Sequence, residues 1–242
     1  MNKLRVVGTS YLDVIDIIHN DKYTKKIQDG GIYNIQQGSK FTVNTAISNI
    51  VINQYGQDVA TKWNGNVGSI NNLYEDFEDE WVHLAYVNTC DIDLGKVKAK
   101  VKSCDLTGDN WFKIGEEKII SNILLCDYVF VAREHLDLLL SKIKNVDYSG
   151  WLVSHDSQGS TLLKPNYKPF DPLGSISPYE KYSVPEINFR HNKENFLFTV
   201  GAGDKFAGHF IEARMSGLEL GECQKIAHEK VLLWLKEVNE SL

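Results

Sequence analysis

Short apolar runs alternate with amphipathic segments along this chain. The runs at 4–8, 12–18, 59–67, 83–87, 101–105, 127–131 and 151–154 have the length of β-strands. Apolar residues recur with helical spacing at 43, 46, 47, 50 and 51, and again at 136, 139, 140 and 143. This spacing predicts a helix in each of the two regions. Helices that separate short strands favour an α/β fold with a mainly parallel central sheet, which binds ligands beyond the carboxyl ends of its strands.

Composition and charge narrow the function classes. The chain has 242 residues, 43% hydrophobic and 24% charged, which is typical of a soluble globular protein with one domain. Its 32 acidic and 26 basic side chains give a net charge of -6, which argues against a broad nucleic-acid-binding face. No apolar stretch approaches the roughly 20 residues that span a bilayer, and the N-terminus does not resemble a signal peptide. We therefore expect a cytoplasmic protein that binds neither nucleic acid nor membrane.

Neither a metal site nor a disulfide framework is expected. Cys90, Cys104, Cys126 and Cys223 are far apart and form no C-x-x-C pair. The seven histidines contain no H-E-x-x-H motif. Buried, reduced thiols are the simplest interpretation of the cysteines.

The clearest chemical signal follows an apolar run at 196–198, which is typical of a strand. Gly201, Ala202, Gly203 and Asp204 come next, and an amphipathic helix begins there and ends near Gly217. Glycines at a strand-to-helix turn let the backbone approach a ligand, and the unpaired amides of the first helical turn form an anion site. An adjacent carboxylate would accept a proton from an attacking hydroxyl, which suits phosphoryl transfer. The simpler alternative is that Asp204 caps the helix.

This segment resembles the C-terminal signature D-T-x-G-A-G-D of the ribokinase-like (PfkB) family of carbohydrate and nucleoside kinases. Three other segments are similar to family elements and follow in the family's order. Residues 8–13 resemble the first strand G-x-x-x-x-D, residues 30–34 the G-G-x-x-x-N element, and residues 151–159 the T-x-G-x-x-G loop that meets the nucleotide. The resemblance implies a three-layer α/β fold with helices on both sides of the sheet and a β lid.

The resemblance also implies a role for each matching residue. Asp204 would be the catalytic base, with the anion site at Gly201, Ala202 and Gly203. The acceptor alcohol would be held by Asp13, Gly31 and Asn34. ATP would lie near Ser154, Asp156 and Gly159, with Mg²⁺ bridging its phosphates. From the residues alone, the alternative is that Asp13 and Asp16 are surface positions beside a half-buried strand and that Asn34 is a turn residue.

Several positions depart from the family pattern. Phe198 and Val200 replace the aspartate and the second threonine of the signature. Asp156 replaces a glycine and places a carboxylate near the expected phosphates, where it would repel them unless Mg²⁺ or a lysine intervenes. The family's N-x-x-E element is replaced by the residues at 132–135. These departures leave open a catalytically impaired sugar- or nucleotide-binding sensor on the same fold.

Three further residues carry open alternatives. Tyr11 and Tyr33 lie near the expected acceptor site and could stack on a base, which leaves open a nucleoside kinase. Lys205 follows the expected base in the first helical turn, where the helix dipole opposes a cation. We expect Lys205 to face solvent, and a contact with phosphate is the alternative.

The chain is short for the family, which implies a single domain over 1–242 with a reduced lid near 14–40. A reduced lid leaves the acceptor site open, so that it either admits a larger acceptor or depends on a second subunit in a homodimer. The short lid and the aspartate-bearing segment at 104–111 are similar to those of the fructoselysine-type kinases. The resulting expectation is an ATP-dependent carbohydrate kinase that phosphorylates an alcohol of a small sugar or sugar conjugate.

Overall fold

The computed structural model describes residues 4–19, 21–53, 58–64, 68–69, 79–106, 115–144, 146–156, 159–165, 179–182 and 198–242. Its strands are β1 (Leu4–His19), β2 (Lys22–Gly31), β3 (Ser39–Ile52), β4 (Asp58–Asn64), β5 (Gly68–Ser69), β6 (Asp79–Ala85), β7 (Cys90–Asp91), β8 (Ala99–Leu106), β9 (Tyr128–Ala132), β10 (Trp151–Asp156), β11 (Gly159–Pro165) and β12 (Tyr179–Tyr182). Its helices are α1 (Glu116–Leu124), α2 (Arg133–Ile143), α3 (Ala202–Met215) and α4 (Leu220–Glu240).

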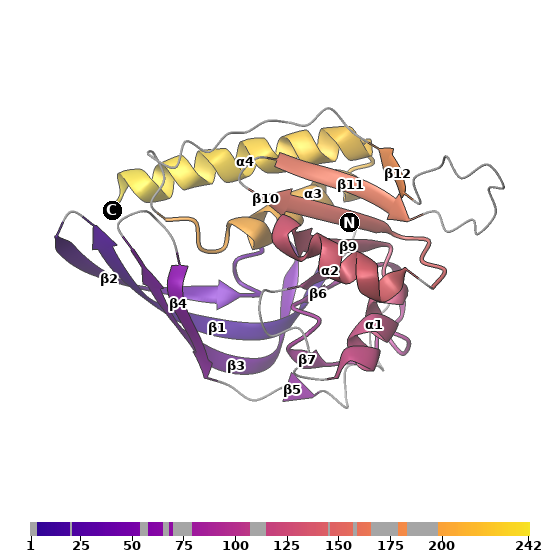
Figure 1. Ribbon diagram of the computed structural model, residues 1–242, viewed down its shortest axis with the longest axis horizontal. Helices are drawn as coiled ribbons and strands as arrows, with labels where there is room; N and C mark the ends of the chain where they lie inside the picture. Colours follow the sequence, from indigo (N-terminus) through magenta and orange to yellow (C-terminus); the bar gives the residue numbers. More distant parts are fainter. Residues whose placement is uncertain are drawn as a thin grey trace.

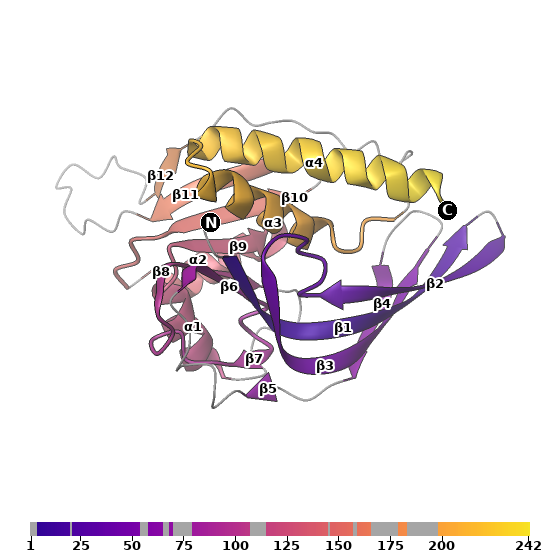
Figure 2. The same cartoon turned by 180° about the vertical axis from the view of Figure 1, so that it is seen from behind.

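One twisted sheet organises the molecule. Its strand order is β12-β11-β10-β9-β8-β6-β1-β3-β4, with β2 also paired to β1. The central strands β3, β1, β6, β8, β9 and β10 run parallel. Strands β2, β4, β11 and β12 pair antiparallel with their neighbours. Helices α3 and α4 cover one face of the sheet and α1 and α2 the other (Figures 1 and 2). The predicted α/β fold with a mainly parallel central sheet is confirmed.

Alternate residues of each strand supply the two hydrophobic cores. On β9, Tyr128 and Phe130 pack with α3 and α4, whereas Val129 and Val131 pack with α1 and α2. Successive side chains of a strand point to opposite faces, so a strand that is covered on both sides is apolar throughout. This explains why the run at 127–131 shows no polar alternation.

The first four strands continue beyond the core as a projecting sheet, which we call the lid. Strand β1 pairs with β6 over residues 4–8 and with β2 over residues 10–19. Strands β3 and β4 extend beside it (Figure 2). The inner face of the lid is apolar and packs on Phe198 and the C-terminal part of α4, through Ile15, Ile17, Ile50 and Ile52. The lid strands thus reach from residue 10 to residue 64, on both sides of the predicted 14–40 region.

The predicted helix at 43–51 is wrong, because these residues belong to β3. The apolar positions 46 and 50 fit both a helical and an alternating pattern. In the structure Ala46, Ser48, Ile50 and Ile52 are all buried, which is the period of a strand. The segment is also rich in valine, isoleucine and threonine, whose branched side chains favour strands.

The sequence predicts a strand at 196–198, but Phe198 is held by hydrogen bonds from a side chain instead of a neighbouring strand. Phe198 belongs to no strand, and residues 196 and 197 lie outside the described part of the chain. The Asn239 amide nitrogen donates to the Phe198 carbonyl at 3.0 Å, and its oxygen accepts from the Phe198 N–H at 2.8 Å. Asn239 therefore supplies the hydrogen bonds that a neighbouring strand would supply.

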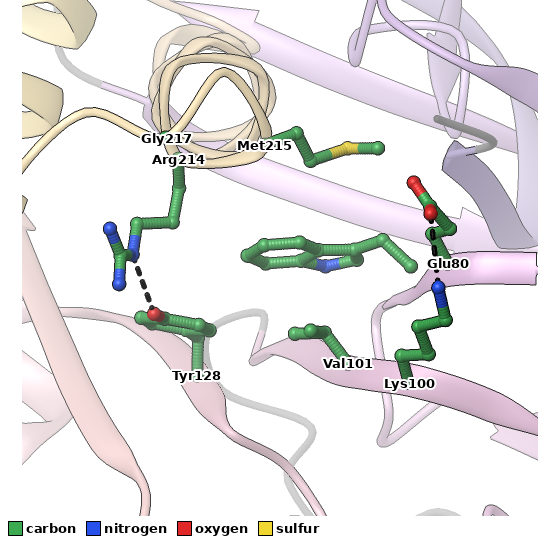
Figure 3. Close-up of a pocket in the computed structure, with 8 residues that line it drawn as sticks. Glu80, Lys100, Val101, Tyr128, Arg214, Met215 and Gly217 are labelled. Carbon is green, nitrogen blue, oxygen red and sulfur yellow. Dashed lines mark hydrogen bonds and ion pairs between the residues drawn. The ribbon is translucent and has the colours of Figure 1, made fainter. Parts of the chain in front are cut away.

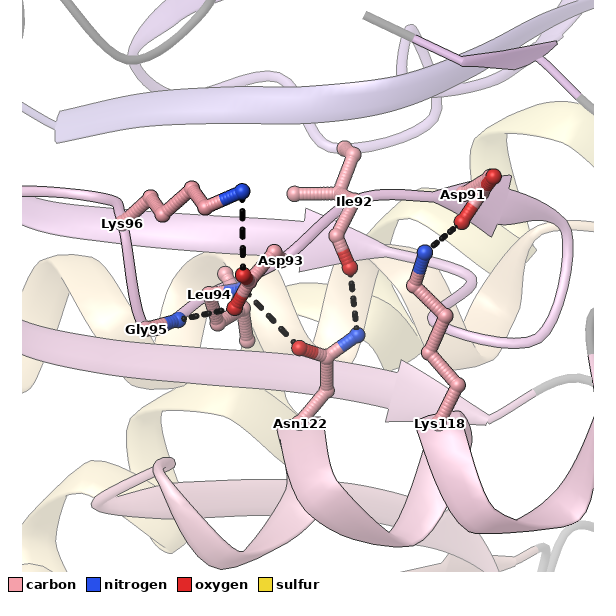
Figure 4. Close-up of polar contacts among 8 residues, drawn as sticks. All are labelled: Asp91, Ile92, Asp93, Leu94, Gly95, Lys96, Lys118 and Asn122. Atoms are coloured by element: carbon pink, nitrogen blue, oxygen red, sulfur yellow. Dashed lines mark hydrogen bonds and ion pairs between the residues drawn. The ribbon is translucent and has the colours of Figure 1, made fainter.

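The segment that follows β6 is fixed on α1 by side-chain contacts. The Asn122 side chain accepts from the Leu94 N–H at 2.9 Å and donates to the Ile92 carbonyl at 2.8 Å, and Lys118 pairs with Asp91 (Figure 4).

No helix within the described ranges is both long and apolar enough to cross a bilayer. The residues at 107–111 of the aspartate-bearing segment lie outside the described part.

Candidate functional site

Asp204 lies in the first turn of α3, where the helix points its amino end toward the carboxyl ends of β6 and β8. Gly201 precedes the helix with a left-handed backbone (φ 87°), a conformation that glycine adopts without strain. Asp204 is 7% exposed and makes no capping hydrogen bond, so the helix-cap alternative does not describe it. The carboxylate instead faces side chains from distant parts of the chain.

The glycine-pair segment and the glycine–alanine–glycine–aspartate segment meet at this carboxylate. The Asn34 side chain donates to Asp204 Oδ2 at 2.9 Å. It also lies directly against Gly201, because a Cβ on Gly201 would be 2.9 Å from the Asn34 Cγ. Asn34 is in a turn, as its residue type predicts, and it is buried in contact with the expected base as well.

Asp13 and the two glycines form the neighbouring wall. Asp13 is 5% exposed, so the surface alternative does not hold for this residue. Its carboxylate occupies the space beside Gly30, where a Cβ would lie 2.0 Å from Asp13 Oδ2. Gly31 has a left-handed backbone (φ 63°), and a Cβ there would collide with the Thr9 carbonyl. The glycine pair therefore allows the chain to turn tightly against β1, which brings Asn34 beneath Asp204.

Two residues that sequence reasoning did not place in the site complete it. Tyr86 follows β6, and its hydroxyl donates to both oxygens of Asp204, at 2.8 and 2.7 Å. Asp105 lies near the end of β8 and is 6% exposed. Tyr86 lies near the end of the apolar run at 83–87, and Asp105 is the last residue of the run at 101–105. Both are at the carboxyl ends of parallel strands, and that position is the signal by which they could have been found.

Burial and mutual repulsion control the charge of these carboxylates. Burial raises the pKa of Asp204 to about 6, the hydrogen bonds from Tyr86 and Asn34 lower it, and the charge of Asp13 raises it. Burial also raises the pKa of Asp13 to about 6. Burial and the charge of Asp204 raise the pKa of Asp105 well above its usual range. A carboxyl with a pKa near 6 is ionised at neutral pH and still basic enough to take a proton.

The amino end of α3 offers amides to an anion. The Ala202 N–H donates to the Thr199 carbonyl at 3.0 Å, and the Lys205 N–H donates to the Gly201 carbonyl at 3.1 Å. Within the described residues, the N–H groups of Gly203 and Asp204 have no hydrogen-bond partner. The amides at 203 and 204 are thus the donors available there, whereas the amide of Ala202 is already used.

The residues expected near ATP lie on β10 and at the start of β11, where Ser154 and Gly159 are buried and Asp156 is half-buried. Asp156 forms an ion pair with Arg133 at 2.8 Å, which offsets the negative charge that the sequence places beside the phosphates. Gly159 begins β11 with a φ of 139°. Ser154 is fully buried, and its hydroxyl has no hydrogen-bond partner among the described residues. His155 lies against Gly203, where a Cβ would be 2.9 Å from the imidazole.

The expectation that Lys205 faces solvent is wrong. Lys205 is 7% exposed, and its ammonium lies 4.7 Å from the centre of the Trp234 ring and 3.5 Å from the Asn34 carbonyl. Burial lowers the pKa of this lysine. A cation–π contact with α4 and a carbonyl contact replace water around the charge, which explains a lysine in the first turn of a helix.

A cavity lies at the edge of the sheet opposite to Asp204. It has a volume of about 350 Å³ and is lined by residues at the amino ends of β6, β8 and β9 and the end of α3 (Figure 3). Arg214 donates to the Tyr128 hydroxyl at 3.0 Å, and Lys100 pairs with Glu80 at 3.1 Å. These polar groups already have partners, and the cavity contains none of the residues expected in the site.

Among the described residues, no group of three or more histidine, cysteine, aspartate or glutamate side chains is arranged to bind a metal ion. Asp13, Asp105 and Asp204 are near enough to influence one another's pKa, but they do not form such a group.

Comparison with solved structures identifies the fold. A nucleoside kinase of Methanocaldococcus jannaschii, an archaeal member of the ribokinase family, is 14% identical, covers 94% of this chain and 89% of its own, and has a TM-score of 0.60. Ribokinase from Thermotoga maritima is 13% identical, with 98% and 93% covered and a TM-score of 0.63. A nucleoside kinase of Burkholderia thailandensis in complex with inosine is 12% identical, with 93% and 88% covered and a TM-score of 0.63.

These likenesses show the ribokinase fold. They confirm the three-layer architecture that the short motifs implied. Neither a protein-family model nor a curated protein sequence matches the chain significantly. The similarity therefore lies in the arrangement of the elements, while most side chains differ.

Proposed function

We propose, from the ribokinase fold and the buried carboxylate at the head of α3, that this protein is a kinase. It would transfer a phosphoryl group from ATP to an alcohol of a sugar or sugar conjugate, with Asp204 as the general base. The observation that carries the proposal is the contact between Asn34 and Asp204, 2.9 Å apart. It joins the expected acceptor segment to the expected base beside two free amides.

The chemistry follows from the charges at this position. An alcohol hydroxyl next to Asp204 would give up its proton to the carboxylate as its oxygen attacks phosphorus. The free amides at 203 and 204 and the dipole of α3 would stabilise negative charge on the phosphoryl group. ATP supplies the phosphoryl group, and Mg²⁺ held by its phosphates neutralises their charge. A positioned base contributes roughly 10²–10⁴-fold to the rate.

The acceptor side favours a polyhydroxylated substrate. An ionised Asp13 would accept hydrogen bonds from two hydroxyls, and Asn34 and the backbone at Gly31 border the same space. These are the groups that recognise vicinal hydroxyls of a sugar. On the donor side, the Arg133–Asp156 pair removes a net negative charge from the loop between β10 and β11. This neutralisation supports ATP binding near Asp156 and Gly159.

An ATP-consumption screen over sugars, amino-sugar conjugates and nucleosides tests the proposal. Each acceptor is compared with a blank that contains ATP-Mg²⁺ alone, and the product is identified by mass. Acceptor-dependent ADP release together with a phosphorylated sugar is the expected result. Calorimetric binding of ATP-Mg²⁺ without turnover on any acceptor would instead indicate the sensor, which the departures at Phe198 and Asp156 leave open.

A nucleoside kinase is the second candidate. Tyr11 and Tyr86 form an edge-to-face pair with ring centres 5.8 Å apart beside Asp204, and this aromatic surface supports the stacking of a base. Two of the structures with this fold are nucleoside kinases. Turnover of nucleosides in preference to sugars in the same screen would favour this function.

The outer face of the lid supports the homodimer that a short lid suggests. Ile27 is 61% exposed, Ile47 46% and Leu12 42%, and all three lie on neighbouring strands. A second subunit would cover this apolar surface. Sedimentation of the wild type and of Ile27→Lys tests this. We expect the wild type to be a dimer and the charged side chain of Ile27→Lys to dissociate it. A wild-type monomer at micromolar concentration would contradict the proposed dimer.

A further inference from the structure

We propose that Tyr86 is a positioning residue for the kinase reaction, which orients the Asp204 carboxylate and holds it ionised at neutral pH. This inference rests on the proposed function and adds a residue that no family motif supplied. Its basis is geometric. One hydroxyl bridges both oxygens of a 7% exposed carboxylate, at 2.8 and 2.7 Å.

The backbone of Tyr86 is strained in a way that points to function. Tyr86 has a φ of 66°, and the only other non-glycine residue with a positive φ in the described ranges is Asp21. An aromatic residue in the left-handed region is a genuine outlier. Strain of this kind persists where the surroundings enforce it, which occurs often at active sites. The Thr89 N–H and hydroxyl both donate to the Tyr86 carbonyl, at 2.9 and 3.1 Å, and fix the turn.

The charges around Asp204 explain why such a residue is needed. The charge of Asp13 on β1 and burial both disfavour the ionised form of Asp204, and an ionised Asp204 in turn raises the pKa of Asp105 on β8. Lys205 is the cation that opposes them, and its ammonium is held against Trp234 and the Asn34 carbonyl.

Two hydrogen-bond donors oppose these effects on the carboxylate. They come from Tyr86 and Asn34, and each stabilises the ionised form. Tyr11 also faces this region, but its pKa is raised by burial, so it remains neutral. Tyr86 thus provides a donor that touches both carboxylate oxygens at once.

Replacement of Tyr86 by phenylalanine removes the donor and keeps the ring. The pKa of Asp204 should rise by about one unit, since hydrogen bonds to a carboxylate lower its pKa on that scale. The acid limb of the pH–activity curve should therefore move up by about one pH unit. Activity relative to wild type should fall about fivefold at pH 6, because the ionised fraction of Asp204 falls from about one half to about one tenth, and recover substantially at pH 9. A uniform loss at every pH, or no loss, would overturn the proposal.

Tyr148→Phe is the matched control. Tyr148 is a fully buried tyrosine whose hydroxyl donates to the Trp151 carbonyl at 3.4 Å, in the core beneath α1 and α2. This variant also loses a buried phenol hydroxyl, but it should leave the shape of the pH–activity curve unchanged. A shift of the curve equal to that of Tyr86→Phe would show that the effect is general and would contradict the proposed role.

A second measurement separates this inference from the proposed function, since it needs no substrate. Unfolding midpoints of wild type and Tyr86→Phe are compared at pH 5 and pH 8. In wild type, Asp204 has a pKa of about 6 against an ordinary value of 3.8, so its contribution to stability is lost as the pH rises through 6. The Tyr86 hydroxyl stabilises the ionised form. The variant should therefore lose more stability at pH 8 than at pH 5.

The same comparison in an Asp204→Asn background completes the test. The extra loss at pH 8 should disappear there, because the background has no carboxylate to ionise. An equal loss at both pH values in both backgrounds would refute the Tyr86–Asp204 coupling. If the coupling is present but no acceptor is phosphorylated, the pair is real and the proposed kinase function is wrong.

Discussion

Replacement of Gly201 by alanine should disturb the candidate site through one atom. The added Cβ would lie 2.9 Å from the Asn34 Cγ and 3.1 Å from its amide nitrogen, so the side chain must move. That amide is the group that donates to Asp204 at 2.9 Å. The variant should therefore lose the Asn34–Asp204 hydrogen bond. It must also hold an alanine in the left-handed backbone conformation of Gly201.

The magnitude has two parts. A left-handed conformation costs a non-glycine residue about 1–2 kcal/mol. A hydrogen bond to a charged group contributes about 1.5–3 kcal/mol. The free energy of unfolding of Gly201→Ala should accordingly fall by about 2.5–5 kcal/mol at pH 8.

Gly217→Ala is a matched control for the backbone. Gly217 has nearly the same φ as Gly201, 86° against 87°, and a Cβ there meets open space. Gly217→Ala should therefore lower the free energy of unfolding only by the cost of the left-handed backbone. Urea unfolding of both variants measures the difference, and the kinase assay should show a loss for Gly201→Ala alone. Equal destabilisation of the two variants with activity retained in both would refute the contact between Gly201, Asn34 and the base.

Two further predictions concern the Phe198 segment and the acceptor side of the site. Asn239→Ala should lower the free energy of unfolding by about 1–3 kcal/mol, because it removes both hydrogen bonds to the Phe198 backbone. Urea unfolding measures this effect against the exposed control Ser241→Ala, and an unchanged midpoint would contradict the prediction. Asp13→Asn removes a negative charge that raises the pKa of Asp204, so the acid limb of activity should move below pH 6 while the acceptor KM rises. A limb that stays in place would show that the two carboxylates do not interact.

The parts of the site that sequence could predict are those in which local chemistry dictates local shape. Glycines at 201 and 203 before an amphipathic helix predicted the turn and the start of α3, and the structure has both. The glycine pair at 30 and 31 predicted a tight turn. The meeting of Asn34 with Asp204 is a contact between residues 170 positions apart. The resemblance implies that both residues lie near the acceptor, but it does not predict their hydrogen bond, and no local pattern encodes it.

The errors come from positions where tertiary packing outweighs the local pattern. The helix expected at 43–51 failed because apolar residues four apart fit both a helix and a strand, and pairing with β1 and β4 selects the strand. Lys205 was expected in water because its charge was considered without Trp234, which comes from α4. Tyr86 was missed because its left-handed backbone and its contact with Asp204 depend on the turn after β6.

The most direct test of the account is the turnover of Asp204→Asn on an acceptor that the wild type phosphorylates. Asparagine keeps the size of the side chain and can still contact Tyr86, but it cannot take the proton of the alcohol. With normal folding and ATP binding, kcat should fall by roughly 10²–10⁴-fold at pH 8. A folded variant with the turnover of wild type would contradict the assignment of Asp204 as the base.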